Sequence, residues 1–253
     1  SALQCLSHLL TFHPNNEHFF NACKRASKDS LIYEWFQFQR KMWNNQSSEI
    51  HNPIQLLQRF QQLCIEKDLY FSNFSQNDID EFLTLFLDLL HQGVKKEVTM
   101  SFSTDVEDEA DKINLKSNET WKRFYEKDYS YIVENFYSQL LSITSCCECD
   151  YYTTNHDPIQ VVSLEIPESA TSLECCLKEY MKKLRLDEQN MWTCDKCHQK
   201  VRPYKQTRLW KTSDVIFILL KRYNRNQKID KYLEYPLTLD LKDYNINYSK
   251  NKS

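Results

Sequence analysis

Two pairs of cysteines carry the clearest chemical signal in this sequence. Cys146 and Cys149 form one C-x-x-C pair, Cys194 and Cys197 form a second, and residues 150–193 separate them. Each pair can offer two thiolates from one turn, and four thiolates complete a closed tetrahedral zinc site without an open position for water. We therefore expect a structural zinc ion on these four residues.

Other residues near these pairs leave alternatives open. Cys147 is a rival ligand, although a C-x-C pairing fits a zinc knuckle less well, and His198 is expected to be an exposed neighbour. Cys175 and Cys176 are expected to pack on a helix. The alternative to metal binding is that the paired cysteines are buried free thiols. Two separate C-x-x-C pairs favour metal, in a reducing compartment, over buried thiols or a disulfide scaffold.

Cysteine nucleophiles raise a different question, because they need an adjacent histidine and a third group that orients it. Cys5 and His8 lie three residues apart on a predicted helix, but no acidic residue is marked to orient the histidine. We interpret the pair as a packed cysteine with a surface or capping histidine. The sequence therefore assigns no catalytic residue within the chain.

Helices are expected in the amino-terminal part. Apolar residues at helical spacing predict a helix over residues 1–10, and mixed helical spacings predict several packed helices over residues 30–72. Asn52-Pro53 is predicted to begin one of them.

The clearest helix is predicted to follow a cap at Ser75 or Asn77, with acidic residues in its first turn and apolar residues along one face. It should end at Gly93, the only glycine in the chain, in the left-handed conformation that favours glycine. Other positions with positive φ are expected to fall on Asn or Asp.

The remaining segments change from polar to strand-like. Residues 95–119 are polar and strongly acidic, which predicts a solvated surface insertion. Residues 159–166 then nearly alternate, with a phase slip at Val161-Val162 that indicates a bulge or a strand covered on both faces. Thr171 and Glu174 match a capping box that opens a helix. Two further strands are predicted at residues 215–220, as a fully buried strand, and at residues 237–241, so the fold class is α+β.

Composition excludes several classes of protein. The 253 residues carry a formal net charge of -3 and a pI near 6.2, so nucleic acid is not an expected partner. No apolar run approaches the roughly 20 residues of a membrane span, and no secretory leader is evident. We expect a soluble intracellular protein, cytoplasmic or nuclear, with no membrane partner. The oligomeric state is not indicated.

Five segments resemble, in order, those of the ubiquitin-specific proteases, the ubiquitin carboxyl-terminal hydrolases of peptidase family C19. Together they cover nearly the whole chain. They are residues 1–8 (SALQCLSH), 76–83 (QNDIDEFL), 136–140 (FYSQL) before the first cysteine pair, 220–223 (LKRY) and 235–239 (YPLTL).

This resemblance implies a papain-like cysteine protease fold with a helical thumb, zinc-ribbon fingers and a β palm. We expect the thumb over residues 1–94, the acidic insertion over 95–119, and the fingers and palm over 120–253, as one incomplete catalytic domain. The implied activity is thiol-dependent hydrolysis of the bond after the carboxyl-terminal glycine of ubiquitin, with ubiquitin or ubiquitinated proteins as partners. Asp78 matches the family acid that contacts the basic ubiquitin tail, although it could instead cap its helix. Glu81 is expected to be structural.

Departures from the family pattern matter as much as the matches. Ser1 aligns just after the segment with the family's catalytic cysteine, and the histidine segment should follow Pro236 but is not found. We therefore expect both catalytic partners to lie outside this chain, and the fragment alone to be inactive. Ser138 replaces a family glycine, and Asn77 replaces a glutamine.

Two rival functions remain. The first is a ubiquitin-binding pseudoenzyme or scaffold that has lost the nucleophile. The second is a zinc-ribbon nucleic-acid binder, which would need a basic face lined with aromatic residues.

Overall fold

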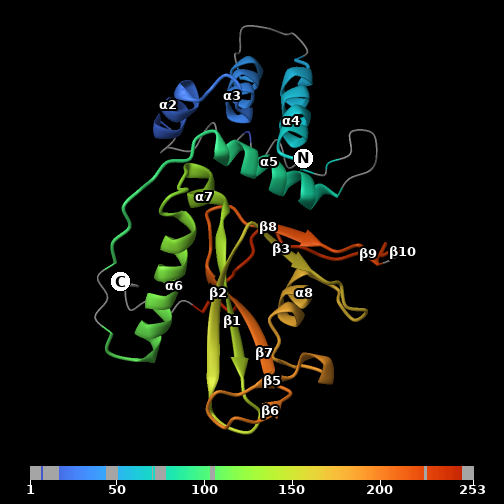
Figure 1. Ribbon diagram of the computed structural model, residues 1–253. Coiled ribbons are helices and arrows are strands. Elements are labelled where there is room, and N and C mark those ends of the chain that lie inside the picture. The colour runs from blue at the N-terminus through green and yellow to red at the C-terminus, as the bar shows by residue number, and fades with distance from the viewer. Residues whose placement is uncertain are drawn as a thin grey trace. The chain divides into compact units, whose positions relative to one another are not determined.

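The computed structural model describes Ser7, residues 17–43, 51–69, Phe71, 78–102, 106–224 and 227–246. The chain divides into two compact units (Figure 1). A helical unit comprises Ser1–Val98 and Lys127–Glu134, and a sheet unit comprises Thr99–Glu126 and Asn135–Ser253. The α+β class is confirmed. Within the described ranges, no helix combines the length and the apolar character needed to cross a bilayer.

The helical unit contains α2 (Glu17–Arg25), α3 (Leu31–Met42), α4 (Ile54–Glu66), α5 (Ile79–Gln92) and the first turn of α7 (Tyr131–Phe136). The helices expected within residues 30–72 are confirmed. Asn52 accepts a hydrogen bond from the Ile54 N–H at 3.1 Å, so the predicted helix entry is confirmed too. The helix expected over residues 1–10 lies outside the described residues, apart from Ser7.

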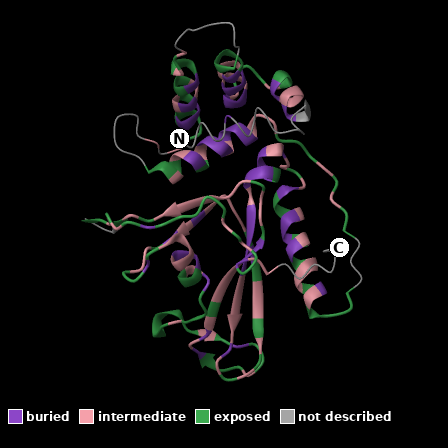
Figure 2. Cartoon of the chain, turned by 180° about the vertical axis from the view of Figure 1, so that it is seen from behind, coloured by how far each residue is buried: buried purple, intermediate pink, exposed green. Residues whose placement is uncertain are grey.

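An aromatic cluster fills the centre of this unit. The ring of Phe86 lies 5.4 Å from those of Trp35 and Phe82, and Phe60 lies 5.3 Å from Phe82. Each such ring pair contributes about 1 kcal/mol to stability, beyond the contribution from the apolar area that it buries. Figure 2 shows the resulting pattern, with one buried stripe along each of α3, α4 and α5. The helices therefore associate through apolar faces.

Gly93 ends α5 at the predicted position but not in the predicted conformation. Its φ is −78°, in the right-handed region. A Cβ at this residue would lie 2.5 Å from Cγ2 of Ile32 on α3. Glycine is needed here because another element approaches closely. The positive φ values in the described part fall on Asp68, as expected of Asp, and on His198, which was not expected.

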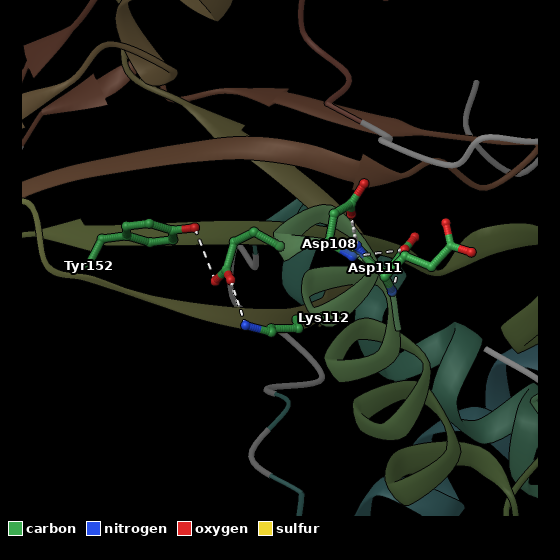
Figure 3. A network of polar contacts seen from close by, with 6 residues as sticks. Asp108, Asp111, Lys112 and Tyr152 are labelled. Carbon is green, nitrogen blue, oxygen red and sulfur yellow. Dashed lines mark hydrogen bonds and ion pairs between the residues drawn. The ribbon is translucent and has the colours of Figure 1, made fainter. Parts of the chain in front are cut away.

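The acidic stretch is not the solvated loop that the sequence predicted. Helix α6 (Glu109–Tyr125) begins there, and Asp108 and Asp111 form its capping box (Figure 3). Asp108 accepts the Asp111 N–H at 2.9 Å, and Asp111 accepts the Asp108 N–H at 3.3 Å. Glu109 accepts hydrogen bonds from Tyr152 and Lys112, which are both labelled in Figure 3. Acidic side chains therefore cap the start of a helix here. The division of the chain into parts at residues 94 and 119 stays a prediction.

A four-stranded antiparallel sheet forms the body of the sheet unit. Its order is β2-β1-β7-β4, from β1 (Ser138–Ser145), β2 (Tyr152–Ile159), β4 (Leu184–Arg185) and β7 (Tyr204–Lys211). Helix α6 is joined to it by Ser117, which donates a hydrogen bond to Oε1 of Gln139 at 2.5 Å. Short helix α7 (Tyr131–Phe136) precedes β1.

Ser138 fits its buried position at the start of β1. Its hydroxyl lies 2.8 Å from that of Ser213 and accepts the Ser213 N–H at 3.1 Å. The side chain thus fastens the start of β1 to the segment after β7.

A parallel pair of strands lies beside α8. Strand β3 (Val161–Leu164) pairs with β8 (Phe217–Leu220), and α8 (Leu173–Tyr180) packs against β3. The phase slip marks a break, because β2 and β3 join different sheets around Gln160. The helix begins one residue later than predicted, with Ser172 as its cap. The side chains of β8 are only partly buried, which corrects the prediction of a fully buried strand.

The remaining strands are short. They are β5 (Trp192–Thr193), which follows a 3-10 turn at Glu188–Asn190, β6 (Lys200–Val201), β9 (Tyr223–Asn224) and β10 (Gln227–Lys228). The strand predicted over residues 237–241 is wrong. This segment forms no strand, and Leu237 is fully exposed.

Candidate functional site

Both cysteine pairs lie in turns between antiparallel strands. Cys146 and Cys149 connect β1 to β2, and Cys194 and Cys197 connect β5 to β6. The pairs meet because Ser145, at the end of β1, pairs with Tyr204, at the start of β7, shortly after β6. Strand pairing thus closes the long gap between the pairs.

The four thiol groups converge. Their sulfur atoms all lie within 4.8 Å of one another, with Cys146 Sγ 3.9 Å from Cys197 Sγ and Cys149 Sγ 3.7 Å from Cys194 Sγ. All four are free cysteines. Sulfur atoms about 2.3 Å from a tetrahedral zinc ion are about 3.8 Å apart, so the spacing fits zinc coordination by four thiolates.

Electrostatics within the cluster also fit a cation. Burial raises the pKa of the Cys194 thiol, but nearby backbone N–H groups outweigh it and lower this pKa to about 7. For Cys149, the Tyr151 N–H favours the thiolate, but burial and the three neighbouring sulfurs raise the pKa to about 12. Thiols this close cannot all ionise alone, whereas a bound dication would stabilise every thiolate.

Contacts around the cluster hold the two turns together. Lys196 in the second turn pairs with Asp150 in the first, and the hydroxyl of Tyr151 donates to Asp195 at 3.2 Å. The rings of Tyr151 and Trp192 stack with centroids 6.0 Å apart. These contacts position the four ligands from both sides.

The alternative ligands lie elsewhere. Cys147 Sγ lies 3.3 Å from a Glu148 carboxylate oxygen and is not one of the four converging thiols. His198 adopts a left-handed φ of 56°, and its N–H donates to the Cys194 carbonyl at 2.8 Å, so it shapes the turn. Cys176 is buried in the core and half-buried Cys175 packs against the same core, so both pack on a helix as predicted.

Asp78 occupies the cap position of α5 without capping it. Its backbone is extended, with φ −71° and ψ 140°, but its side chain makes no hydrogen bond to the helix. The residue is exposed, as is Glu81 one turn later. Buried Leu83, Phe86 and Leu87 hold the helix in the unit. The Asp78 carboxylate is thus open to a ligand. The caps expected at Ser75 or Asn77 lie outside the described residues.

A buried polar pair in the helical unit escaped sequence analysis. Nδ1 of His91 lies 2.7 Å from the hydroxyl of Ser130, which also accepts the N–H groups of Ile132 and Val133 at the start of α7. Burial lowers the pKa of His91, against the opposing effect of nearby carboxylates. Since Ser130 serves as a helix cap, this pair is structural. Cys5 and His8 lie outside the described residues.

Comparisons with known proteins find relatives of a single family. A family model described as ubiquitin carboxyl-terminal hydrolase matches residues 1–253. Ubiquitin carboxyl-terminal hydrolase 5 of Saccharomyces cerevisiae is 29% identical, over 76% of this chain and 25% of that protein. Ubiquitin carboxyl-terminal hydrolase Usp2 of Drosophila melanogaster is 28% identical, over 99% of this chain and 27% of that protein. The chain thus spans about a quarter of their length.

A solved structure shares the fold. The structure of the SAGA Ubp8/Sgf11/Sus1/Sgf73 DUB module bound to ubiquitin aldehyde matches with a TM-score of 0.69 and 23% identity. The match covers all of this chain and 52% of the other. At this identity, the likeness establishes the fold.

Proposed function

The chain belongs to the ubiquitin carboxyl-terminal hydrolase family, whose model spans residues 1–253, and from this premise we propose that its parent protein is a thiol-dependent deubiquitinase. It hydrolyses the peptide or isopeptide bond after the carboxyl-terminal glycine of ubiquitin. The family match over every residue is the observation that carries this proposal. The nucleophilic cysteine and its histidine lie outside the 253 residues, so the fragment alone is inactive.

Within this proposal, the four converging cysteines hold a structural zinc ion. Zinc with four thiolates has no position left for water, so it supplies no nucleophile. Its role is to keep the β1–β2 and β5–β6 turns together and thereby to stiffen the sheet that holds the globular part of ubiquitin. The reducing cytoplasm or nucleus suits such a site, because its thiols must stay free of disulfides.

Asp78 is the residue that we assign to ubiquitin binding. The ubiquitin tail is basic and extended, and a carboxylate can accept charge-assisted hydrogen bonds from its arginines or its backbone amides. The missing cap bond and the exposure of Asp78 support this assignment over a purely helix-capping role.

Asp78→Asn tests the assignment against Glu81→Gln, which removes an exposed acid from the first turn of the same helix. Asp78→Asn should weaken ubiquitin binding about tenfold, because a charge-assisted hydrogen bond becomes a neutral one. Glu81→Gln should change binding less than twofold. Equal losses in titration calorimetry would remove the special role of Asp78.

Catalysis is tested on the parent polypeptide with its natural flanks. It is treated with ubiquitin that carries a thiol-reactive carboxyl terminus, and mass spectrometry records labelling. A ubiquitin-sized mass increase that disappears when the expected upstream cysteine is replaced is the predicted result. Ubiquitin binding without labelling would instead favour the rival function, a ubiquitin-binding pseudoenzyme.

A further inference from the structure

Residues 178–211 are basic in an acidic chain. This segment holds ten lysines and arginines against four acidic residues, whereas the whole chain has a formal net charge of -3. Five of its cations gather beside β4 and β7, and we call them the basic track. They are Lys178, Lys182, Lys183, Arg185 and Arg208.

Strand geometry and ring contacts place three of these cations, Lys183, Arg185 and Arg208, on one face of the sheet. Arg208, Gln206 and Tyr204 share a face of β7, because successive side chains alternate, while Lys205 takes the opposite face. Lys183 Nζ lies 4.8 Å, and the guanidinium carbon of Arg185 5.9 Å, from the centroid of the Tyr204 ring. Tyr204 thus holds both cations over the face that it shares with Arg208.

Little on the protein neutralises this charge. Lys182 pairs with Glu179 at 3.2 Å, but no carboxylate among the described residues lies within ion-pair distance of the other four cations. Arg208 donates through Nη1 to the Asp243 carbonyl at 3.3 Å. Its buried Nε has no hydrogen-bond partner in the described part of the chain. Unpaired like charges repel, and a buried donor without an acceptor is costly, so both favour an anionic ligand.

Two surface cavities adjoin the track. The first, of about 250 Å³, is lined by Lys178, Lys182, Arg208 and Gln206, together with Met181, Asp243 and Tyr244. The second, of about 260 Å³, has Lys183 and Gln206 in its wall, with Thr154 and Ser145 among its uncharged lining residues. Gln206 borders both. A ligand can therefore place one anionic group on each side of the Gln206 amide.

The spacing of these groups matches an extended peptide. Arg208, Gln206 and Tyr204 follow one another at alternate positions of a strand, about 6.7 Å apart along it. Side chains on one side of an extended peptide repeat at the same interval. The Tyr204 ring already lies beneath two cations, so it does not offer the open face on which a nucleic-acid base stacks.

We propose that the basic track binds an extended acidic polypeptide segment with Asp or Glu at alternate positions. Two carboxylates enter the two cavities, and the Gln206 amide lies between them. This interaction does not rest on the proposed hydrolase activity, and it gives the chain a second means of choosing protein partners by charge.

The test uses the 253-residue protein and a fluorescein-labelled peptide with four Glu-Thr repeats. Fluorescence anisotropy should show binding that Lys183→Gln weakens about threefold and Lys178→Gln/Lys183→Gln about tenfold, as expected for exposed charge pairs. Lys205→Gln is the matched control, because it removes the same charge from the opposite face of β7. It should change the affinity less than 1.5-fold, within the range of surface charge effects.

Three results would overturn the proposal. One is absence of binding at low salt. Another is an equal loss in Lys205→Gln, which would mean that only overall charge matters. The third is displacement of the peptide by octathymidylate at lower concentration than by unlabelled peptide, which would indicate a nucleic-acid ligand.

Discussion

The centre of the helical unit and the cysteine-bearing end of the sheet unit are stabilised by different means. In the first, buried aromatic rings such as Phe60 and Phe86 pack with many buried aliphatic side chains. In the second, the hydrophobic cluster around the cysteine turns has three buried residues, Cys146, Cys194 and Val201. So small an apolar cluster cannot offset the entropy of ordering two turns. Burial therefore suffices for one region, whereas the other depends on its ligands.

Removal of zinc should give the largest difference in stability between these two regions. Structural zinc contributes on the order of 10 kcal/mol to small zinc domains, so a chelator should unfold the turns at residues 146–151 and 193–200. Hydrogen-exchange mass spectrometry should show lost protection there and unchanged protection in α4 and α5.

Cys194→Ser should reproduce the effect of the chelator, whereas Cys147→Ser, beside the site but outside the thiol cluster, should not. Equal loss of protection in α4 and α5 would mean that the two regions share one source of stability.

Acidification should distinguish His91 from His156, which are both buried. His91 contacts Ser130, whereas neither ring nitrogen of His156 on β2 has a hydrogen-bond partner in the described part of the chain. Burial, followed by the nearby Lys116 charge, lowers the pKa of His156 to about 4. The folded state then binds fewer protons than the unfolded state, whose histidine has a pKa near 6.5.

The stabilisation from neutral His156 is complete above pH 6.5 and is lost as the pH falls towards 4. A difference of about 2.5 pKa units corresponds to about 3 kcal/mol. Urea denaturation of the wild type and His156→Leu should show that the substitution flattens this pH dependence. Parallel pH profiles for the two proteins would exclude His156 as its source.

Gly93→Ala should have the smallest effect and should be confined to the helical unit. The new Cβ would overlap Ile32, at a cost of about 1 to 2 kcal/mol in the free energy of unfolding. Ile32→Ala removes the opposing methyl group, so the double variant should lose less than the sum of the single losses. Additive losses in a double-mutant cycle would contradict the contact.

Local signals in the sequence were sufficient for many elements. The C-x-x-C spacing identified the four converging thiols, and helical periodicity identified α3, α4 and α5. Polar residues hid α6, because its buried side includes Asp111, Ser117 and Thr120 as well as Trp121. A helix with such a face lacks the apolar period on which sequence prediction depends.

Tertiary context decided the remaining points. No local signal shows that Ile32 approaches Gly93, so a left-handed cap was the reasonable but wrong expectation. Strand pairing between β1 and β7 brings the two cysteine pairs together, and their spacing alone cannot show this. The sequence also could not decide whether Asp78 caps α5, because capping depends on side-chain orientation.

Metal analysis of the purified protein tests the central claim most directly. Native mass spectrometry with elemental analysis should find one zinc ion per chain, retained by Cys147→Ser and lost by Cys194→Ser. A chain that is folded at the cysteine turns without any metal, or that binds zinc only when Cys147 is present, would contradict the account.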